Sequence, residues 1–236
     1  MKKQITRADE RMHTQIDWLN SRHSFSFGGH YDPERMGFGP LRVVNDDIVA
    51  PGRGFGSHPH RDMEIISLVL EGELEHRDNL GNGRVIRGGD LQYMSAGSGV
   101  VHSEFNPSKE QPVHFMQIWI EPREKGLPPR YADQPVVGTE ENVWKLLLSE
   151  DGREGSMQIR QDAELRSVQL SAGREISYTA KDEGRGIWIF VIEGSIEIGE
   201  DSLAAGDSLA LWHPDRVVLR NTDTAATRLL IFDVPL

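Results

Sequence analysis

Short runs of β-branched, aromatic and other apolar residues recur along the whole chain, separated by glycine, aspartate and asparagine. They are GPLRVVNDD, EIISLVLEGELEH, VHFMQIWIEP, SVQLSAG, GIWIFVIEGSIEIG, DSLALW and TRLLIFDVPL. Runs of this length between turn residues are typical of strands in sandwiches and barrels. With 24 glycines and 12 prolines spread through 236 residues, the pattern predicts an all-β protein with few short helices.

The strand pattern occurs twice in the sequence. The first half contains LVLEGELEHRDNLGNGRVIRGGDLQYM, and the second half contains the similar stretch FVIEGSIEIGEDSLAAGDSLALW. Gly72 aligns with Gly194 at an offset of 122 residues, and Gly89 aligns with Gly206 at an offset of 117, so one hairpin loop is shorter in the second copy. Each copy contains a strand, a Glu-Gly turn, a strand, a Gly-Asp turn and a strand, which favours one β-barrel duplicated and fused.

Between the two copies the composition changes. In EPREKGLPPRYADQPVVG, residues 121–138, prolines and charges replace apolar residues, as is typical of a crossing between domains. We therefore predict two tandem domains, an N-terminal barrel over residues 1–123 and a C-terminal barrel over residues 124–236.

Charge and composition exclude several classes of function. A formal net charge of −11 argues against direct binding to nucleic acid, which needs a basic surface. Because the chain has no cysteine, any metal must be held by His, Glu or Asp. The N-terminal stretch MKKQITRADERMHTQ has no apolar core of signal-peptide length, and WIFVI is far too short to cross a membrane. We expect a cytoplasmic protein, as a monomer.

Two pairs of polar residues share the same spacing. His58 and His60 stand in GFGSHPHRDMEI, and His102 and Glu104 stand in SAGSGVVHSEFNP. Side chains two residues apart in a strand project from the same face. Two such pairs on neighbouring inner strands of a barrel would surround one cation with three imidazoles and one carboxylate, a set that suits a divalent first-row metal.

Other candidate residues carry weaker signals. His76, His114 and His213 are single, so a structural role is favoured over ligation. His23 and His30 could line an entrance, although a structural role is favoured for them too. Trp119, Trp188 and Trp212 fall at strand-like positions and are expected in the core. The glycines of PGRGFGS precede no helix-start signal, and no G-x-S-x-G motif is present, so neither a phosphate loop nor a serine hydrolase is indicated.

The same residues resemble a known family. The spacing from Gly52 to His60, and that from Gly97 to Asn106, are similar to the two cupin motifs. More narrowly, RHSFSFGGHYDP, MGFGPLRVVNDD, HPHRDMEI, GDLQYMSAGSGVVHSEFN and QIWIEP resemble the pirin branch of cupins, specifically the bacterial pirin-like proteins. The resemblance covers nearly all of residues 1–123 and, more loosely, the rest.

The resemblance implies a bicupin fold whose N-terminal barrel binds one metal, usually iron(II), through His58, His60, His102 and Glu104. Nickel, manganese, cobalt, copper and zinc are further possibilities for such ligands. General cupins carry a glutamate five residues after the second histidine, where this sequence has Ile65. Pirins take the carboxylate from beside the later histidine, so Glu104 is the expected ligand, and Glu64 is expected next to the ligands or at the rim.

The second copy lacks these residues. At the offsets of 122 and 117, the positions of the four candidate ligands correspond to Ala180, Asp182, Leu219 and Asn221. None of these residues is a histidine. We therefore expect a metal-free C-terminal barrel.

By resemblance to pirins, we expect quercetin 2,3-dioxygenase activity, in which a flavonol reacts with O2 and carbon monoxide leaves. Glu104 would ligate the metal and is also the candidate acceptor of the substrate proton, although a carboxylate on a dication is a poor base unless one oxygen swings free. One alternative is a non-catalytic metal-binding module that acts through a protein partner. Another is zinc or nickel chemistry without O2, such as isomerisation.

Overall fold

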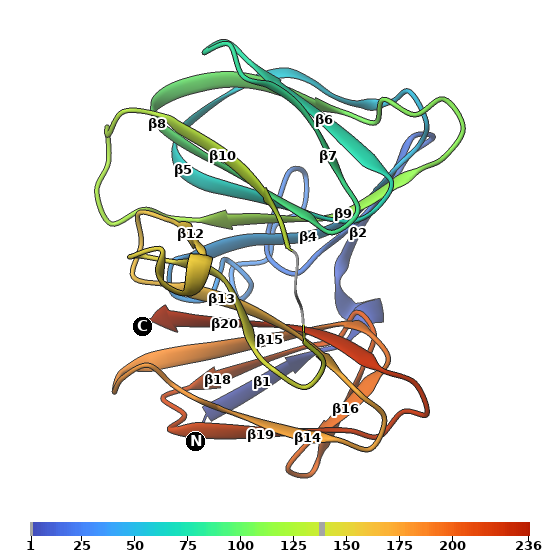
Figure 1. Cartoon of the computed structure of the whole chain (residues 1–236), viewed down its shortest axis with the longest axis vertical. Helices are drawn as coiled ribbons and strands as arrows, with labels where there is room; N and C mark the ends of the chain where they lie inside the picture. Colours follow the sequence, from blue (N-terminus) through green and yellow to red (C-terminus); the bar gives the residue numbers. More distant parts are fainter. Residues whose placement is uncertain (1, 137–139) are drawn as a thin grey trace.

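The computed structural model describes residues 2–136 and 140–236, and it consists of two stacked β-barrels (Figure 1). The strands of the N-terminal barrel are β2 (Met12–Gln15), β3 (Leu19–His23), β4 (Leu41–Val49), β5 (Gly54–Glu71), β6 (Glu73–Asp78), β7 (Gly83–Arg87), β8 (Asp90–Phe105), β9 (Val113–Ile120) and β10 (Arg130–Pro135). They form one sheet in the order β2-β3-β4-β9-β5-β8-β6-β7, and β10 also pairs with β8.

The C-terminal barrel contains two sheets. Their strands are β1 (Lys2–Thr6), β11 (Lys145–Ser149), β12 (Met157–Gln158), β13 (Glu164–Leu170), β14 (Glu175–Thr179), β15 (Arg185–Glu193), β16 (Ser195–Ile198), β17 (Asp201–Ala204), β18 (Ser208–Trp212), β19 (Arg216–Asn221) and β20 (Thr227–Pro235). One sheet has the order β1-β18-β15-β20-β13-β11-β12, and the other has the order β14-β19-β16-β17.

The predicted all-β bicupin is confirmed. Each of the seven apolar runs lies on strands, namely β4, β5 with β6, β9, β13, β15 with β16, β18 and β20. The only helices among the described residues are the single 3₁₀ turns η1 (Ala8–Glu10) and η2 (Arg153–Gly155). None of the described helices has the length and apolar character needed to span a bilayer.

Both ends of the N-terminal region cross the predicted boundary between the domains. β1 pairs with β18, with Ile5 opposite Leu209, so the first strand completes a sheet of the C-terminal barrel. β10 lies within the predicted linker but pairs with β8, with Tyr131 opposite Met94. The last part of that linker, at residues 137–138, lies outside the described residues. The division at residue 123 stays a prediction. Each barrel contains one strand from the other side of that division, since β10 joins the N-terminal barrel and β1 joins the C-terminal barrel.

The two barrels meet through a shared apolar layer. On β9, Met116, Ile118 and Ile120 are buried in one cluster with residues of β13, β15 and β20, which lie across the interface in Figure 1. The alternate residues of β9, such as Phe115, face the interior of the N-terminal barrel. Because successive side chains of a strand point to opposite faces, a strand buried on both faces can serve the interface and the barrel interior at once.

The internal repeat is also visible in the fold. Gly72 and Gly194 follow β5 and β15 with φ of 81° and 78°, and Gly89 and Gly206 precede β8 and β18 with φ of 91° and 84°. These positive φ values favour glycine because it has no Cβ. The corresponding connections, β5 to β6 and β15 to β16, and β7 to β8 and β17 to β18, therefore turn in the same way on either side of the hairpins β6-β7 and β16-β17.

A pair of asparagines corrects the alignment beyond the hairpins. The Asn106 side-chain amide donates to the carbonyls of Val49 and Gln111, and its Oδ1 accepts from the backbone of Ser108. Asn221 makes the same set of bonds in the second barrel, to the carbonyls of Leu170 and Ala225 and from the backbone of Asp223. Asn221 is thus the counterpart of Asn106, at an offset of 115, and not of Glu104.

With this offset, Val217 and Leu219 stand where His102 and Glu104 stand in the first barrel. Tyr178 is paired with Val217 on β14 and β19, as His58 is paired with His102 on β5 and β8. Val217 and Leu219 belong to the apolar cluster that fills the second barrel. The position of the first barrel's candidate ligands is thus occupied by packed side chains in the second.

The buried amide of Asn221 is expected to matter for stability. Asn221→Ala leaves two backbone carbonyls without their donor and should lower the free energy of unfolding by about 1–3 kcal/mol. Glu197→Ala, at an exposed position on β16, is the control and should change it by less than about 0.5 kcal/mol. Urea denaturation measures both, and equal stability of the two variants would contradict the assigned role.

Candidate metal centre

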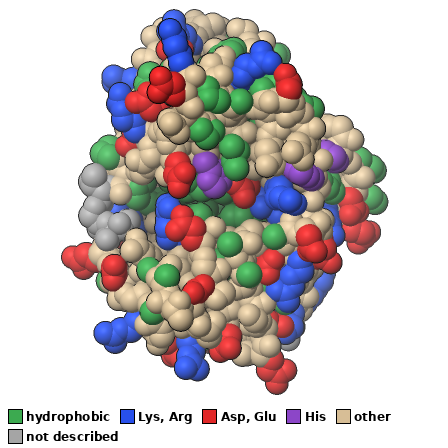
Figure 2. Space-filling model, turned by 90° about the vertical axis from the view of Figure 1, so that its right-hand side faces the viewer, with side chains coloured by type: hydrophobic (Ala, Val, Ile, Leu, Met, Phe, Trp, Pro, Cys, Tyr) green, Lys and Arg blue, Asp and Glu red, His purple; other side chains and the backbone are tan. Residues whose placement is uncertain are grey.

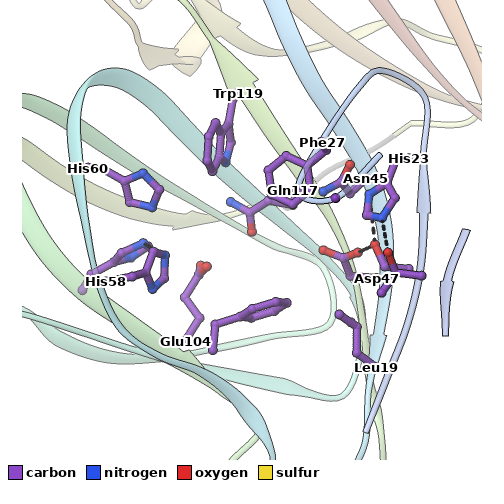
Figure 3. Close-up of a pocket in the computed structure, with 16 residues that line it drawn as sticks. Leu19, His23, Phe27, Asn45, Asp47, His58, His60, Glu104, Gln117 and Trp119 are labelled. Carbon is purple, nitrogen blue, oxygen red and sulfur yellow. Dashed lines mark hydrogen bonds between the residues drawn. The ribbon is translucent and has the colours of Figure 1, made fainter. Parts of the chain in front are cut away.

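Two long strands carry the four predicted ligands. β5 and β8 are antiparallel partners, and His58 lies opposite His102 in the register. His60 follows two residues after His58 on the same face, and Glu104 follows His102 in the same way. The four side chains therefore project into one cavity of the N-terminal barrel (Figure 3).

Asp62 changes the face that β5 presents to the barrel interior. It has a positive φ of 65°, and the pairing with β8 is irregular between His60 and Asp62. Beyond this point Ile65 faces inward and packs with Met94, whereas Glu64 faces the C-terminal barrel. The position of the general cupin glutamate is thus apolar.

Glu64 does not lie beside the ligands, which corrects the expectation from the sequence. Its Oε2 accepts a hydrogen bond of 2.6 Å from the hydroxyl of Tyr93 and one of 2.8 Å from the backbone N–H of Arg160. The side chain is fully buried. Glu64 therefore links the two barrels.

Three imidazoles face one another at the cavity, with ring centroids 4.5–4.9 Å apart. His58 Nδ1 lies 2.7 Å from the carbonyl of Gly56, to which it can only donate, so the His58 Nε2 carries a lone pair. His102 Nε2 lies 3.0 Å from His58 Nε2. His60 Nε2 is buried and has no hydrogen-bond partner among the described residues. The lone pair of His58, the His102 nitrogen 3.0 Å from it and the unpartnered nitrogen of His60 fit a shared cation.

The positions of these atoms agree with that interpretation. Ligand atoms of His58, His60 and His102 all lie within 4.8 Å of one another. Burial, reinforced by the neighbouring imidazoles, lowers the pKa of His60 to about 4 and the pKa of His102 to about 3. Both rings are therefore neutral at pH 7, as metal ligation requires.

Glu104 enters the same cavity with one oxygen already engaged. Its Oε1 accepts a hydrogen bond of 3.0 Å from the Ser67 hydroxyl, which also lies 3.3 Å from Oε1 of Gln117. The other carboxylate oxygen has no protein donor among the described residues. Glu104 thus has one oxygen held by β5 and one oxygen available to a cation.

His76 adjoins the candidate site on the side away from the cavity. Its Nδ1 lies 3.4 Å from His102 Nδ1, and its Nε2 lies 3.1 Å from Oδ2 of Asp78. If His76 donates to the Asp78 carboxylate, its Nδ1 can accept from His102, and the His102 Nε2 is left unprotonated. The chain Asp78–His76–His102 thus fixes the tautomer that ligation needs.

His76, His102 and Glu104 form a second group of close ligand atoms. Both nitrogens of His76 have protein partners, however, whereas the buried His60 Nε2 has none. Buried polar groups without a partner are rare in proteins. The group of His58, His60 and His102 is therefore the better candidate for the cation, and the structural role predicted for His76 is the better interpretation of that residue.

The cavity next to these residues has a volume of about 240 Å³. Trp119 lies on its wall, edge-on to His60 with ring centroids 4.9 Å apart and edge-on to Phe27 at 5.4 Å. It is half-buried and packs against the core cluster of Ile65, Met94 and Val100, so it contacts the core, as predicted, and lines the cavity as well. His23 also lines the cavity. Apolar rings and a few polar groups around a cavity are typical of a small-molecule site.

Four further candidate residues do not line the cavity, namely His114, His213, Trp188 and Trp212. His114 is half-buried, with Nε2 2.6 Å from Oδ1 of Asp46, and His213 is exposed. Trp188 is buried in the layer between the barrels, as predicted for a core residue. Trp212 is half-buried and packs edge-on against Phe38.

The face drawn in Figure 2 has no large basic patch, and its Lys and Arg side chains are interspersed with Asp and Glu side chains.

Comparisons with known proteins agree with the fold and the site. Residues 5–120 match the Pirin family, and residues 146–234 match the quercetinase C-terminal cupin domain. The chain is 41% identical over 231 residues to a protein named quercetin 2,3-dioxygenase from Escherichia coli K12, with 98% of each chain covered. It is 42% identical to a putative quercetin 2,3-dioxygenase of Pseudomonas aeruginosa over 96% of this chain and 97% of the relative.

Solved structures show the same similarity. The bacterial pirin YhhW of Escherichia coli superposes with a TM-score of 0.94 at 40% identity, over 99% of this chain and 98% of that one. Its complex with nickel(II) gives a TM-score of 0.93, with 99% of both chains covered.

The fold and the histidine cluster together define a bicupin with a candidate metal site in its first barrel. The chain belongs to the pirin family.

The contact between His76 and His102 leads to a prediction about metal affinity. His76→Phe keeps a ring against Tyr131, on which His76 is stacked with centroids 4.8 Å apart, but removes the acceptor for His102 Nδ1. The Kd for nickel(II) should rise by about 10–100-fold. Competition titration with a chelator measures it, with His213→Asn as the control. An unchanged Kd in folded His76→Phe protein would contradict the tautomer assignment.

Proposed function

We propose that this protein is a metal-dependent dioxygenase that cleaves a flavonol with O2. One flavonol and one O2 would give one carbon monoxide and one depside. The observation that carries the proposal is the convergence of three imidazoles, with ligand atoms within 4.8 Å of one another, on a cavity that also contains the carboxylate of Glu104. The relatives that are named quercetin 2,3-dioxygenase, and that match nearly the whole chain, support it.

We propose His58, His60, His102 and Glu104 as the metal ligands. The resident metal would be iron(II), because a reaction with O2 is served by a metal that changes oxidation state, which zinc does not. Nickel(II) in a similar bicupin supports a site for divalent first-row metals. When bound, such an ion lowers the pKa of a hydroxyl ligand and assists its reaction with O2.

The residues of the chain have separate tasks in this proposal. Trp119 and Phe27 offer aromatic faces and edges against which a planar ring system can pack. The cavity of about 240 Å³ is smaller than the about 300–1,000 Å³ of typical ligand sites, so the distal ring of a flavonol would extend into the opening. Ser67 holds one oxygen of Glu104 and so fixes the direction from which the carboxylate approaches the cation.

Oxygen consumption tests the proposal. Protein reconstituted with iron(II) should consume O2 and bleach the flavonol absorbance in equal amounts and release carbon monoxide. His60→Ala should lose at least about 100-fold of this activity because one ligand is missing, whereas His213→Asn should retain it. If the loaded protein binds metal but consumes no O2 with any flavonol, the proposal is wrong and a non-catalytic metal-binding module is favoured.

A further inference from the structure

The proposed reaction needs a group that accepts the proton of the flavonol hydroxyl, and Glu104 is poorly placed for this task. One of its oxygens accepts from Ser67, and the other is the one available to the cation. A carboxylate bound to a dication has a low proton affinity. With one oxygen held by β5, Glu104 lacks a free oxygen for the proton.

A second carboxylate lies on the opposite wall of the same cavity. Asp47 on β4 lines the cavity together with Glu104, and its side chain is labelled across from Glu104 in Figure 3. Only 3% of the residue is exposed. Its Oδ1 accepts a short hydrogen bond from the Ser21 hydroxyl, whereas its Oδ2 has no protein donor among the described residues. One oxygen therefore holds the side chain in place and the other can receive a proton.

We propose that Asp47 is the catalytic base that takes the hydroxyl proton of the ligand. This inference rests on the proposed function in taking a flavonol as the ligand. The O–H bond of the ligand breaks, its electron pair stays on the ligand oxygen, and the proton forms a new bond to Oδ2 of Asp47. The products of the step are the ligand anion and a neutral carboxylic acid, so charge and atoms balance.

The surroundings of Asp47 make it a stronger base than an ordinary carboxylate. Burial raises its pKa to about 7, and the neighbouring charges of Asp46 and Glu104 act in the same direction. The Ser21 hydroxyl and the Arg11 guanidinium oppose the rise. Above about pH 7 Asp47 is ionised and ready to accept a proton, and below that pH it is already protonated. A base with a pKa near the working pH is the most effective kind.

A chain of hydrogen bonds leads from Asp47 to His30 in the segment that follows β3. Ser21 Oγ lies 3.3 Å from Nδ1 of His23, and His23 Nε2 lies 2.9 Å from Oγ1 of Thr14. Thr14 Oγ1 in turn lies 3.0 Å from Nε2 of His30. Thr14, Ser21 and Asp47 are successive register partners on β2, β3 and β4. Each hydroxyl can donate in either direction and each imidazole can carry its proton on either nitrogen, so the chain suits proton exchange between Asp47 and the half-buried His30.

The test uses the full-length protein loaded with nickel(II), without O2, and the probe 3-hydroxyflavone. This flavonol has one acidic hydroxyl, and its anion absorbs at a longer wavelength than the neutral form. At pH 8 the wild type should bind the probe as its anion without releasing a proton to the buffer, because the proton stays on Asp47. Asp47→Asn keeps the shape but cannot take the proton, so it should release about one proton for each anion bound, as measured by titration calorimetry in buffers of different ionisation enthalpy. Asp46→Asn removes the same charge from the other face of β4, where Asp46 contacts His114, and should bind the anion without proton release, as the wild type does.

Steady-state rates give a second readout, with iron(II) and O2. Asp47→Asn should lower kcat by about 10²–10⁴-fold with full metal content. Ser21→Ala keeps the carboxylate but removes its donor, so the pKa of Asp47 rises and the acidic limb of kcat/KM should move to higher pH. A merely structural role of Asp47 would produce no such shift.

The outcomes separate this inference from the proposed function. Equal proton release in the wild type and in metal-loaded Asp47→Asn would overturn the role of Asp47 and leave the dioxygenase proposal intact. If Asp47→Asn does not fold, an unmoved acidic limb in Ser21→Ala overturns it instead. If no flavonol is oxidised but proton release differs between the two proteins, the dioxygenase proposal fails and Asp47 stands as the proton acceptor for hydroxyl ligands of this site.

Discussion

Strand β9 of the first barrel is buried on both faces, and the site depends on this constraint. The outward residues of β9, among them Ile118, pack against the second barrel, while the inward Gln117 and Trp119 line the cavity. A shift of the register by one residue would exchange the two sets and place polar groups in the apolar layer. The contact between the barrels therefore also fixes which side chains reach the cavity, and this gives the second barrel a role without ligands of its own.

The side chains of a regular strand alternate between its two faces, and an interruption of this alternation in β5 also shapes the site. If β5 alternated without a break, Glu64 would share a face with His58 and His60. The positive φ of Asp62 turns the strand, so that Glu64 instead accepts from the backbone of Arg160 in the second barrel. One backbone angle thus removes a carboxylate from the cavity and uses it to join the domains.

The candidate site combines groups whose protonation is set by their partners. One nitrogen of His102 contacts His76 and the other faces the cavity. In the same way, one oxygen of Glu104 accepts a hydrogen bond from Ser67 and the other is available in the cavity. In both cases one end of the side chain is held by the barrel and the other end is left free. Such supporting contacts orient ligands in metal sites. On the opposite wall Ser21 holds Asp47 in the same manner.

Local sequence determined the strands, the turns and the candidate ligands, because two-residue periodicity, turn glycines and the spacing of His58, His60, His102 and Glu104 are properties of short segments. Only the tertiary structure decided where β1 and β10 pair, that Asn221 matches Asn106, that Trp119 and Asp47 line the cavity, and that His76 contacts His102 from behind. These residues come from strands far apart in the sequence, and each has an ordinary local pattern. Their proximity follows from the pairing of β strands over long sequence separations, which no short stretch of sequence records.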